Sequence, residues 1–215
     1  MRPSVRGFVE MCSGALPLAG PVLEFGSFQV DEPGQEGIAD LRPLFAGKGY
    51  VGVDLRKGPG VDVLMDVHCA GVGTASVGTV LLVDTLEHVE YPHRALEEVH
   101  RVLSGQGTVI LTSVMDFPIH EHPNDFWRFT PQGFVSLLRP FAHVMVDSLG
   151  EPDFPHTVVG IGFKRKIPDE GRVALEGMCR AWRREWSGDG DGTDRSMMAR
   201  LVPPLVHELR GRVRR

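Results

Sequence analysis

The sequence predicts an α/β fold in which a mainly parallel sheet is covered by helices on both faces. Short apolar runs alternate with longer stretches of helical periodicity along roughly the first three quarters of the chain, which is typical of βαβ units. The chain has 215 residues, of which 42% are hydrophobic and 24% charged, enough for one sizeable core. We therefore expect one α/β domain followed by a tail.

Five apolar runs predict buried strands at residues 22–25, 50–54, 61–65, 78–84 and 107–114. The stretches 37–45 and 92–103 between them predict helices. The second begins at Pro92, which suits the first turn of a helix, and its apolar residues recur at helical spacing. Right-handed crossovers are expected between the parallel strands.

The second half of the chain changes character after residue 114. Residues 115–130 show no periodicity and predict a long ordered loop of the kind that carries function. A helix is predicted at 131–138, and the β-like runs 141–149 and 157–164 predict an antiparallel hairpin. Because the Arg-rich, helical pattern starts at residue 166, we expect a domain over residues 1–165 and a helical extension over 166–215.

Composition limits the partners and the compartment. The formal net charge of −5 gives no general attraction to nucleic acid or to an anionic membrane. The three cysteines are far apart, which argues against a disulfide framework. The first 20 residues contain charge and no sustained apolar core, so we expect neither a signal peptide nor a membrane span, and a cytoplasmic location.

Acidic residues stand at the ends of two predicted strands. Glu24 is followed by Phe25 and Gly26, and Asp54 ends the run Tyr50-Val-Gly-Val-Asp54. A carboxylate at the carboxyl end of a parallel strand can accept hydrogen bonds from ribose hydroxyls, and a glycine lets the backbone approach a ligand. The pair of strands therefore predicts a nucleoside-containing ligand.

Two further segments carry a family resemblance. They are residues 83–89, Val-Asp-Thr-Leu-Glu-His-Val, and residues 101–107, Arg-Val-Leu-Ser-Gly-Gln-Gly. Together with the two strand ends they make residues 20–165 resemble the class I S-adenosylmethionine-dependent methyltransferases. The resemblance implies a Rossmann-like, doubly wound, mainly parallel seven-stranded sheet with an antiparallel edge strand, and S-adenosylmethionine as the cofactor.

The resemblance also implies individual cofactor contacts along the strand ends. Glu24 and Gly26 are similar to the motif that contacts the methionine part, and Asp54 to the ribose acid. Asp66 is similar to the acid at the adenine amine, with a turn residue as the alternative interpretation. The implied set of cofactor contacts is Glu24, Gly26, Ser27, Asp54, Leu55, Asp66, Val67, Asp84 and Thr85.

The loop after Gly26 departs from the family pattern. Phe28 and Val30 occupy positions where the family prefers glycine, and their Cβ atoms restrict how closely the backbone can approach a ligand. We expect a rebuilt loop in which Gly34 and Gly37 take over the role of the missing glycines.

The predicted loop carries the candidate catalytic groups. His120 and His122 have a suitable pKa for taking a proton from an alcohol, a phenol or an ammonium acceptor. Asp125 would orient the histidine or serve as an alternative base. Histidines that only bond loop carbonyls remain the competing interpretation, and His88 is assigned to packing rather than to catalysis. The spacing of His120 and His122 can suit a metal, but no third ligand with suitable spacing follows, so no metal centre is expected.

Three residues are candidate substrate contacts. Trp127, beside Phe126 and Phe129, would either wall an apolar pocket or anchor the loop. Arg128 would clamp an anionic acceptor that needs no base. His156 would approach the same pocket from the hairpin.

The predicted function is transfer of a methyl group from S-adenosylmethionine to an oxygen or nitrogen atom of a small molecule. The altered first loop keeps a catalytically silent binding or scaffold protein as the alternative. A nicotinamide-dependent oxidoreductase is disfavoured because the first turn lacks the G-x-G-x-x-G pattern. The tail with Trp182 and Trp186 predicts an amphipathic helix that packs on the body or on a second subunit, which leaves a homodimer open.

Overall fold

The computed structural model describes residues 1–30, 37–120 and 124–187, and in them seven strands form one sheet. The strand order is β3-β2-β1-β4-β5-β7-β6, with β1–β5 parallel and β7 antiparallel to both β5 and β6. The predicted seven-stranded, mainly parallel sheet is confirmed. Strand β7 lies between β5 and the edge strand β6. The strands are β1 (Val22–Phe25), β2 (Tyr50–Asp54), β3 (Val63–Leu64), β4 (Val77–Val83), β5 (Leu103–Val114), β6 (His143–Glu151) and β7 (Phe154–Phe163).

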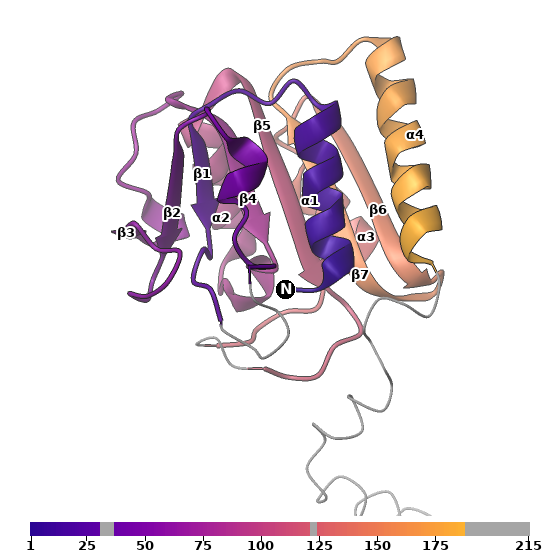
Figure 1. Cartoon of the computed structure of the whole chain (residues 1–215), viewed down its shortest axis with the longest axis horizontal. Helices are drawn as coiled ribbons and strands as arrows, with labels where there is room; N and C mark the ends of the chain where they lie inside the picture. The colour runs from indigo at the N-terminus through magenta and orange to yellow at the C-terminus, as the bar shows by residue number, and fades with distance from the viewer. Residues whose placement is uncertain (31–36, 121–123, 188–215) are drawn as a thin grey trace, which may run out of the picture.

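Helices cover both faces of this sheet (Figure 1). Helices α1 (Pro3–Ala15) and α4 (Asp169–Trp186) share one buried apolar cluster with one face of the sheet, and α2 (Pro92–Val102) and α3 (Pro131–Leu137) share another with the opposite face. Strand β4 lies between the two clusters, and all seven of its residues are buried. Helix α2 buries residues at the predicted helical spacing, namely Ala95, Leu96, Val99 and Val102.

The prediction of a helix at residues 37–45 is wrong. Only a 3₁₀ turn, η1 (Arg42–Phe45), forms there, with Pro43 in its first turn. Gly37 has a φ of +76°, a left-handed conformation that does not continue a helix. The same face of the sheet is covered by α1, a helix that was not predicted from the sequence, although Val5, Phe8, Val9 and Cys12 have helical spacing and are buried.

Helix α4 packs on the body of the same chain. Trp182 is fully buried, its indole nitrogen donates to the carbonyl oxygen of Ser4 at 2.9 Å, and its ring meets Phe8 edge-on at 5.2 Å. The described part of the predicted extension therefore shares a core with α1. The remainder of that extension, residues 188–215, lies outside the described residues.

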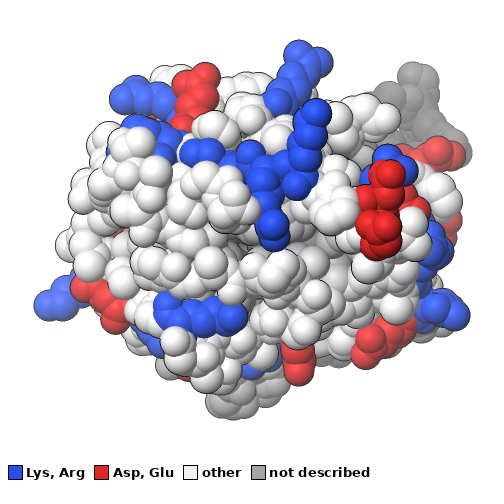
Figure 2. Space-filling view, turned by 90° about the horizontal axis from the view of Figure 1, so that it is seen from above, with Lys and Arg blue, Asp and Glu red and all other residues white. Residues whose placement is uncertain are grey.

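The two edges of the sheet differ. Figure 2 looks onto the edge at which the parallel strands begin, where Lys and Arg side chains gather near the middle and acidic side chains lie towards the rim. The predicted acids of the site lie at the opposite edge, where β1, β2 and β4 end. None of the helices in the described ranges has the length and apolarity needed to cross a bilayer.

Candidate active site

A glycine turn joins the ends of β1 and β4. Gly26 has a φ of +78°, and a Cβ atom built on it would lie 2.4 Å from Oγ1 of Thr85, so only glycine fits. Thr85 is buried, and its hydroxyl lies 3.0 Å from the carbonyl oxygens of both Phe25 and Val83. The two predicted residues Gly26 and Thr85 are thus brought together where the sheet's strand order reverses, which is where α/β sheets bind ligands.

The loop after Gly26 runs toward the end of β2. Phe28 donates its backbone N–H to Asp54 at 3.3 Å, and the Arg56 guanidinium lies 4.3 Å from the Phe28 ring centroid. The Phe28 ring also fills the space beside Gly58. The described part of the loop, up to residue 30, therefore stacks on the segment after β2. Of the glycines expected to compensate, Gly34 lies outside the described residues, and at Gly37 no described atom lies within 4 Å of the place a Cβ would take.

Asp54 stands at the end of β2, as predicted for a ribose acid. Only 8% of the residue is exposed. Its Oδ1 accepts from the backbone N–H of Arg56 at 2.9 Å and lies 3.3 Å from the Nε of the same residue. The neighbouring Ser27 is buried, and its Oγ has no hydrogen-bond partner among the described residues.

Glu24 is hydrogen-bonded to the neighbouring strand β2. Its carboxyl accepts a hydrogen bond from the Tyr50 hydroxyl at 2.7 Å. Burial, which disfavours the charged form, raises the pKa of Glu24 to about 7 in spite of the Tyr50 hydrogen bond. Glu24 thus has a partner within the sheet.

Asp66 lies in a turn of its own. It caps η2 (Val67–Cys69) by accepting from the backbone N–H of His68 at 2.8 Å, and its Oδ1 is 2.6 Å from Nδ1 of the same residue. Val67 is buried and Leu55 is 60% exposed. The turn interpretation of Asp66 is therefore realised, and its carboxylate still borders solvent.

The end of β4 is strained and tied to β5 and α1. Asp84 has a φ of +45°, unusual for a residue other than glycine. Its Oδ1 accepts from the Thr112 hydroxyl at 2.8 Å and lies 3.8 Å from the guanidinium of Arg2. The same guanidinium donates to the backbone oxygen of His156 at 3.2 Å. Arg2, which was not predicted from the sequence, therefore links the predicted residues Asp84 and His156.

Glu87 was also missed. It belongs to η3 (Leu86–His88), is fully buried, and accepts from the Ser113 hydroxyl at 2.7 Å through Oε2. Its Oε1 has no hydrogen-bond partner among the described residues. Burial first, and then the negative charge of Asp84, raise the pKa of Glu87 well above its usual range. The sequence signal for Glu87 was an acidic residue between the apolar residues Leu86 and Val89.

The predicted pairing of His120 with Asp125 is present. Nδ1 of His120 lies 3.2 Å from Oδ2 of Asp125, which also accepts the His120 backbone N–H at 2.8 Å. Arg128 donates two hydrogen bonds to the carboxylate of Asp125, at 2.5 and 2.8 Å. Although burial opposes it, the Arg128 bonds hold the pKa of Asp125 at about 2. Arg128 also donates to the carbonyls of Phe117 and Pro118, so this arginine anchors the loop.

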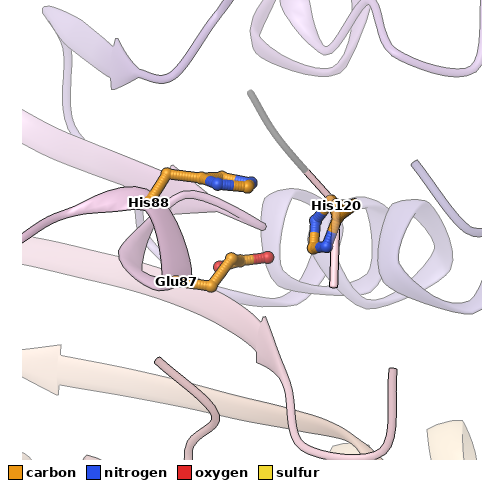
Figure 3. A group of neighbouring side chains, drawn as sticks. All are labelled: Glu87, His88 and His120. Carbon is orange, nitrogen blue, oxygen red and sulfur yellow. The ribbon is translucent and has the colours of Figure 1, made fainter. Parts of the chain in front are cut away.

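The loop folds back over η3. The backbone N–H groups of Phe126 and Trp127 both donate to the carbonyl of Glu87, at 2.8 and 3.2 Å. The rings of His88 and His120 are consequently 4.8 Å apart, edge to face. Figure 3 shows the two imidazoles and the Glu87 carboxylate converging on one point. His122 lies outside the described residues.

The remaining substrate candidates lie at two places. Trp127 is 44% exposed and donates its indole N–H to the carbonyl of Val89 at 3.0 Å. It also lines a cavity of about 620 Å³ together with Tyr91, Pro92 and Phe129. Trp127 therefore both anchors the loop through its indole N–H and lines this cavity. His156 lies instead beside Arg2, with its Nδ1 2.8 Å from the Thr157 hydroxyl.

A family model described as a methyltransferase domain matches residues 45–111, which run from the end of η1 to β5. The chain therefore contains an S-adenosylmethionine-dependent methyltransferase domain. The cofactor of this methyltransferase is therefore S-adenosylmethionine, as predicted. No curated protein is significantly similar to the sequence.

Solved structures of methyltransferases share the fold. A Thermotoga maritima protein described as a possible histamine N-methyltransferase is 21% identical, with a TM-score of 0.53 over 75% of this chain and 92% of that one. The 1,6-didemethyltoxoflavin-N1-methyltransferase of Burkholderia thailandensis, solved with its acceptor and S-adenosylhomocysteine, is 18% identical, with a TM-score of 0.58 over 76% and 79%. A putative Haloferax volcanii methyltransferase bound to the Trm112 activator is 17% identical, with a TM-score of 0.53 over 75% and 90%.

The residues of this methyltransferase fit its cofactor at one place. The turn at Gly26 leaves no space for a side chain, and the buried Oγ of Ser27 has no partner among the described residues. Gly26 meets Thr85 at the end of β4, whereas Ser27 lies against β2, where its backbone N–H donates to the carbonyl of Val53 at 3.1 Å. A buried polar atom without a partner is rare in a folded protein, and a ligand that supplies the partner accounts for it.

Proposed function

We propose that this methyltransferase transfers a methyl group to an oxygen or nitrogen atom of a small molecule. The observation that carries the proposal is the pairing of His120 with Asp125 beside η3, at 3.2 Å. An acceptor oxygen or nitrogen that carries a proton must lose it during methylation, and an imidazole held by a carboxylate is suited to take it. With Nδ1 directed to Asp125, the basic lone pair of His120 lies on Nε2.

We propose that the cofactor is held at the ends of β1, β2 and β4, by Gly26, Ser27, Asp54 and Thr85. Asp54 would accept hydrogen bonds from the ribose hydroxyls. The Nε of Arg56, now 3.3 Å from the Asp54 carboxylate, would move away to make room for them. When bound, S-adenosylmethionine supplies a methyl group activated by a positively charged sulfur. The protein's own contribution is to position the acceptor, exclude water and take up its proton.

We propose fewer substrate contacts than the sequence predicted. Arg128 makes hydrogen bonds to Asp125, Phe117 and Pro118, so we propose a positioning role for it instead of an anion clamp. Trp127 and His156 remain the proposed acceptor contacts. One structural neighbour is described as a possible histamine N-methyltransferase, and another as an N1-methyltransferase with bound 1,6-didemethyltoxoflavin. These descriptions support a small acceptor that is methylated on nitrogen.

The test measures formation of S-adenosylhomocysteine with panels of phenols, alcohols, amines and carboxylates. Turnover with an amine or hydroxyl acceptor, and a large loss of turnover in His120→Ala, would support the proposal. Calorimetric titration with S-adenosylhomocysteine serves as a separate measurement of cofactor binding. Tight cofactor binding without turnover on any panel would instead favour the silent binding protein.

A further inference from the structure

Three side chains capable of binding a metal meet beside the proposed acceptor position. Glu87 and His88 come from η3, and His120 comes from the loop after β5. One ligand atom from each lies within 4.8 Å of the other two, and Figure 3 shows the side chains pointing toward one another. No pattern in the sequence indicates this cluster, because His120 lies 32 positions after His88.

One oxygen of the Glu87 carboxylate has no hydrogen-bond partner among the residues that the structure describes. Glu87 is fully buried, and Ser113 satisfies only Oε2. Oε1 has no hydrogen-bond partner among the described residues, although it is removed from water. Leaving a carboxylate oxygen buried without a partner costs free energy, and a cation removes that cost.

Both imidazoles are oriented by groups behind them. Nδ1 of His88 is 2.5 Å from the carbonyl oxygen of Asn124. Nδ1 of His120 is 3.2 Å from both the carbonyl of Pro118 and Oδ2 of Asp125. An acceptor at Nδ1 puts the proton there and the lone pair on Nε2, which is how carbonyls and carboxylates orient metal-binding histidines.

We propose that Glu87, His88 and His120 bind one divalent transition-metal ion of the zinc type. Two imidazole nitrogens and one carboxylate oxygen suit Zn²⁺ or Fe²⁺, whereas Mg²⁺ and Ca²⁺ prefer oxygen ligands. Two ligands of a tetrahedral Zn²⁺ lie about 3.4 Å apart, while the ligand atoms of the cluster lie within 4.8 Å of one another. Binding Zn²⁺ therefore needs these atoms to approach one another by up to about 1.4 Å.

This metal site rests on the proposed function and deepens it. Three protein ligands leave a coordination position for the acceptor's oxygen or nitrogen. Binding to the metal would favour loss of the acceptor's proton to solvent. The lone pair that remains forms the new bond to the methyl carbon, while the carbon–sulfur bond breaks and its electron pair neutralises the sulfonium. His120 would then activate the acceptor through the metal instead of taking the proton itself.

The test is direct metal binding to the full chain. The protein is treated with a chelator, dialysed and titrated with ZnCl₂ by calorimetry, and Co²⁺ is substituted to record its visible absorption. We expect one Zn²⁺ per chain, and a loss of affinity above about 100-fold in Glu87→Gln, His88→Ala and His120→Ala, because loss of a ligand exceeds the 10–100-fold cost of losing an outer partner. Asp125→Asn is expected to lose about 10-fold.

His93→Ala is the matched control, since this histidine is exposed on α2 outside the cluster, and it should bind Zn²⁺ like the unchanged protein. Circular dichroism verifies that each variant folds. Equal Zn²⁺ affinity in His120→Ala, Glu87→Gln and the control would overturn the proposal, as would a chain that takes up no Zn²⁺. Metal binding without methyl transfer would refute the proposed function and leave the metal site standing, and chelator-insensitive turnover by a metal-free chain would refute the activation step.

Discussion

The site groups next to β1 and β2 come from the ends of those two strands, whereas those next to β4 and β5 are gathered from three segments: the N-terminus at Arg2, η3 after β4 and the loop after β5. We call Gly26, Ser27, Asp54 and Thr85 the cofactor half of the site, and Arg2, Asp84, Glu87, His88 and His120 the acceptor half. In the cofactor half, Gly26 and Asp54 are fixed by the register of neighbouring strands. The acceptor half combines residues from the N-terminus of α1, from η3 and from the loop after β5. The cofactor half thus depends on the pairing of adjacent strands, and the acceptor half on contacts between segments that are not adjacent in the sheet.

His120→Ala tests whether the two halves work separately. We expect kcat/KM for methyl transfer to fall by about 10²–10⁴-fold, as for loss of a group that activates the acceptor. Affinity for S-adenosylhomocysteine should be unchanged, as measured by calorimetry. Weakened cofactor binding would mean that the division into halves is wrong.

Gly26→Ala should be the most damaging change to stability in the cofactor half. The new Cβ would meet Thr85 Oγ1 at 2.4 Å at a φ of +78°, so we expect a loss of about 2–4 kcal/mol in the free energy of unfolding. Gly37→Ala is the matched control, because its φ is +76° and no described atom lies within 4 Å of the new Cβ. Only the backbone cost of about 1–2 kcal/mol is expected there. Urea unfolding measures both, and equal losses would remove the argument for close contact with Thr85.

Glu24→Gln should change how stability depends on pH. The folded pKa is raised from 4.5 to about 7, so the unfolded chain ionises first and wild-type stability falls as the pH rises from about 4.5 to 7. The glutamine variant lacks this loss and should gain up to about 3 kcal/mol relative to wild type above pH 7, with little difference near pH 4. Urea unfolding at several pH values measures it. Parallel pH profiles would show that Glu24 is ionised in the folded protein.

Asp54→Ala tests the ribose assignment. Loss of a hydrogen-bonded carboxylate should weaken binding of S-adenosylhomocysteine by about 1.5–3 kcal/mol, as for hydrogen bonds to charged groups. Calorimetry measures the affinity, and circular dichroism checks the fold. Retained affinity in a folded variant would show that Asp54 serves only Phe28 and Arg56.

Trp127→Phe should have the smallest effect. It removes the indole hydrogen bond to the carbonyl of Val89 and should cost about 1 kcal/mol of stability. An unchanged KM for the acceptor, with that stability loss, would assign Trp127 to anchoring. The same stability loss with a raised KM would assign it to the acceptor half.

The sheet was predictable because its strands are continuous apolar runs. Strand β4 illustrates this, as it is buried on both faces and was predicted within one residue of its start. The stretch 37–45 misled because the apolar spacing of Leu41 and Phe45 fits a helix, while Pro43 and the left-handed Gly37 limit it to a 3₁₀ turn. Burial of those two side chains was the correct part of that prediction.

Within the acceptor half, the contact predicted from the sequence is between residues that are close in sequence. His120 and Asp125 lie five positions apart, and their pairing followed from residue types. The approach of His120 to Glu87 and His88 depends on a loop closing over η3, and Arg2 reaches Asp84 only because α1 lies against the sheet. No spacing in the sequence encodes such contacts, since they follow from tertiary packing.

The loop after β5 is fastened to Glu87 by main-chain hydrogen bonds from Phe126 and Trp127. Such bonds do not depend on which side chains the two donors carry, proline excepted. Descendants of this chain could therefore exchange the loop's side chains, and with them the acceptor, without detaching the loop. The Glu87 carbonyl would thus keep the loop in place while the side chains that contact the acceptor change during evolution.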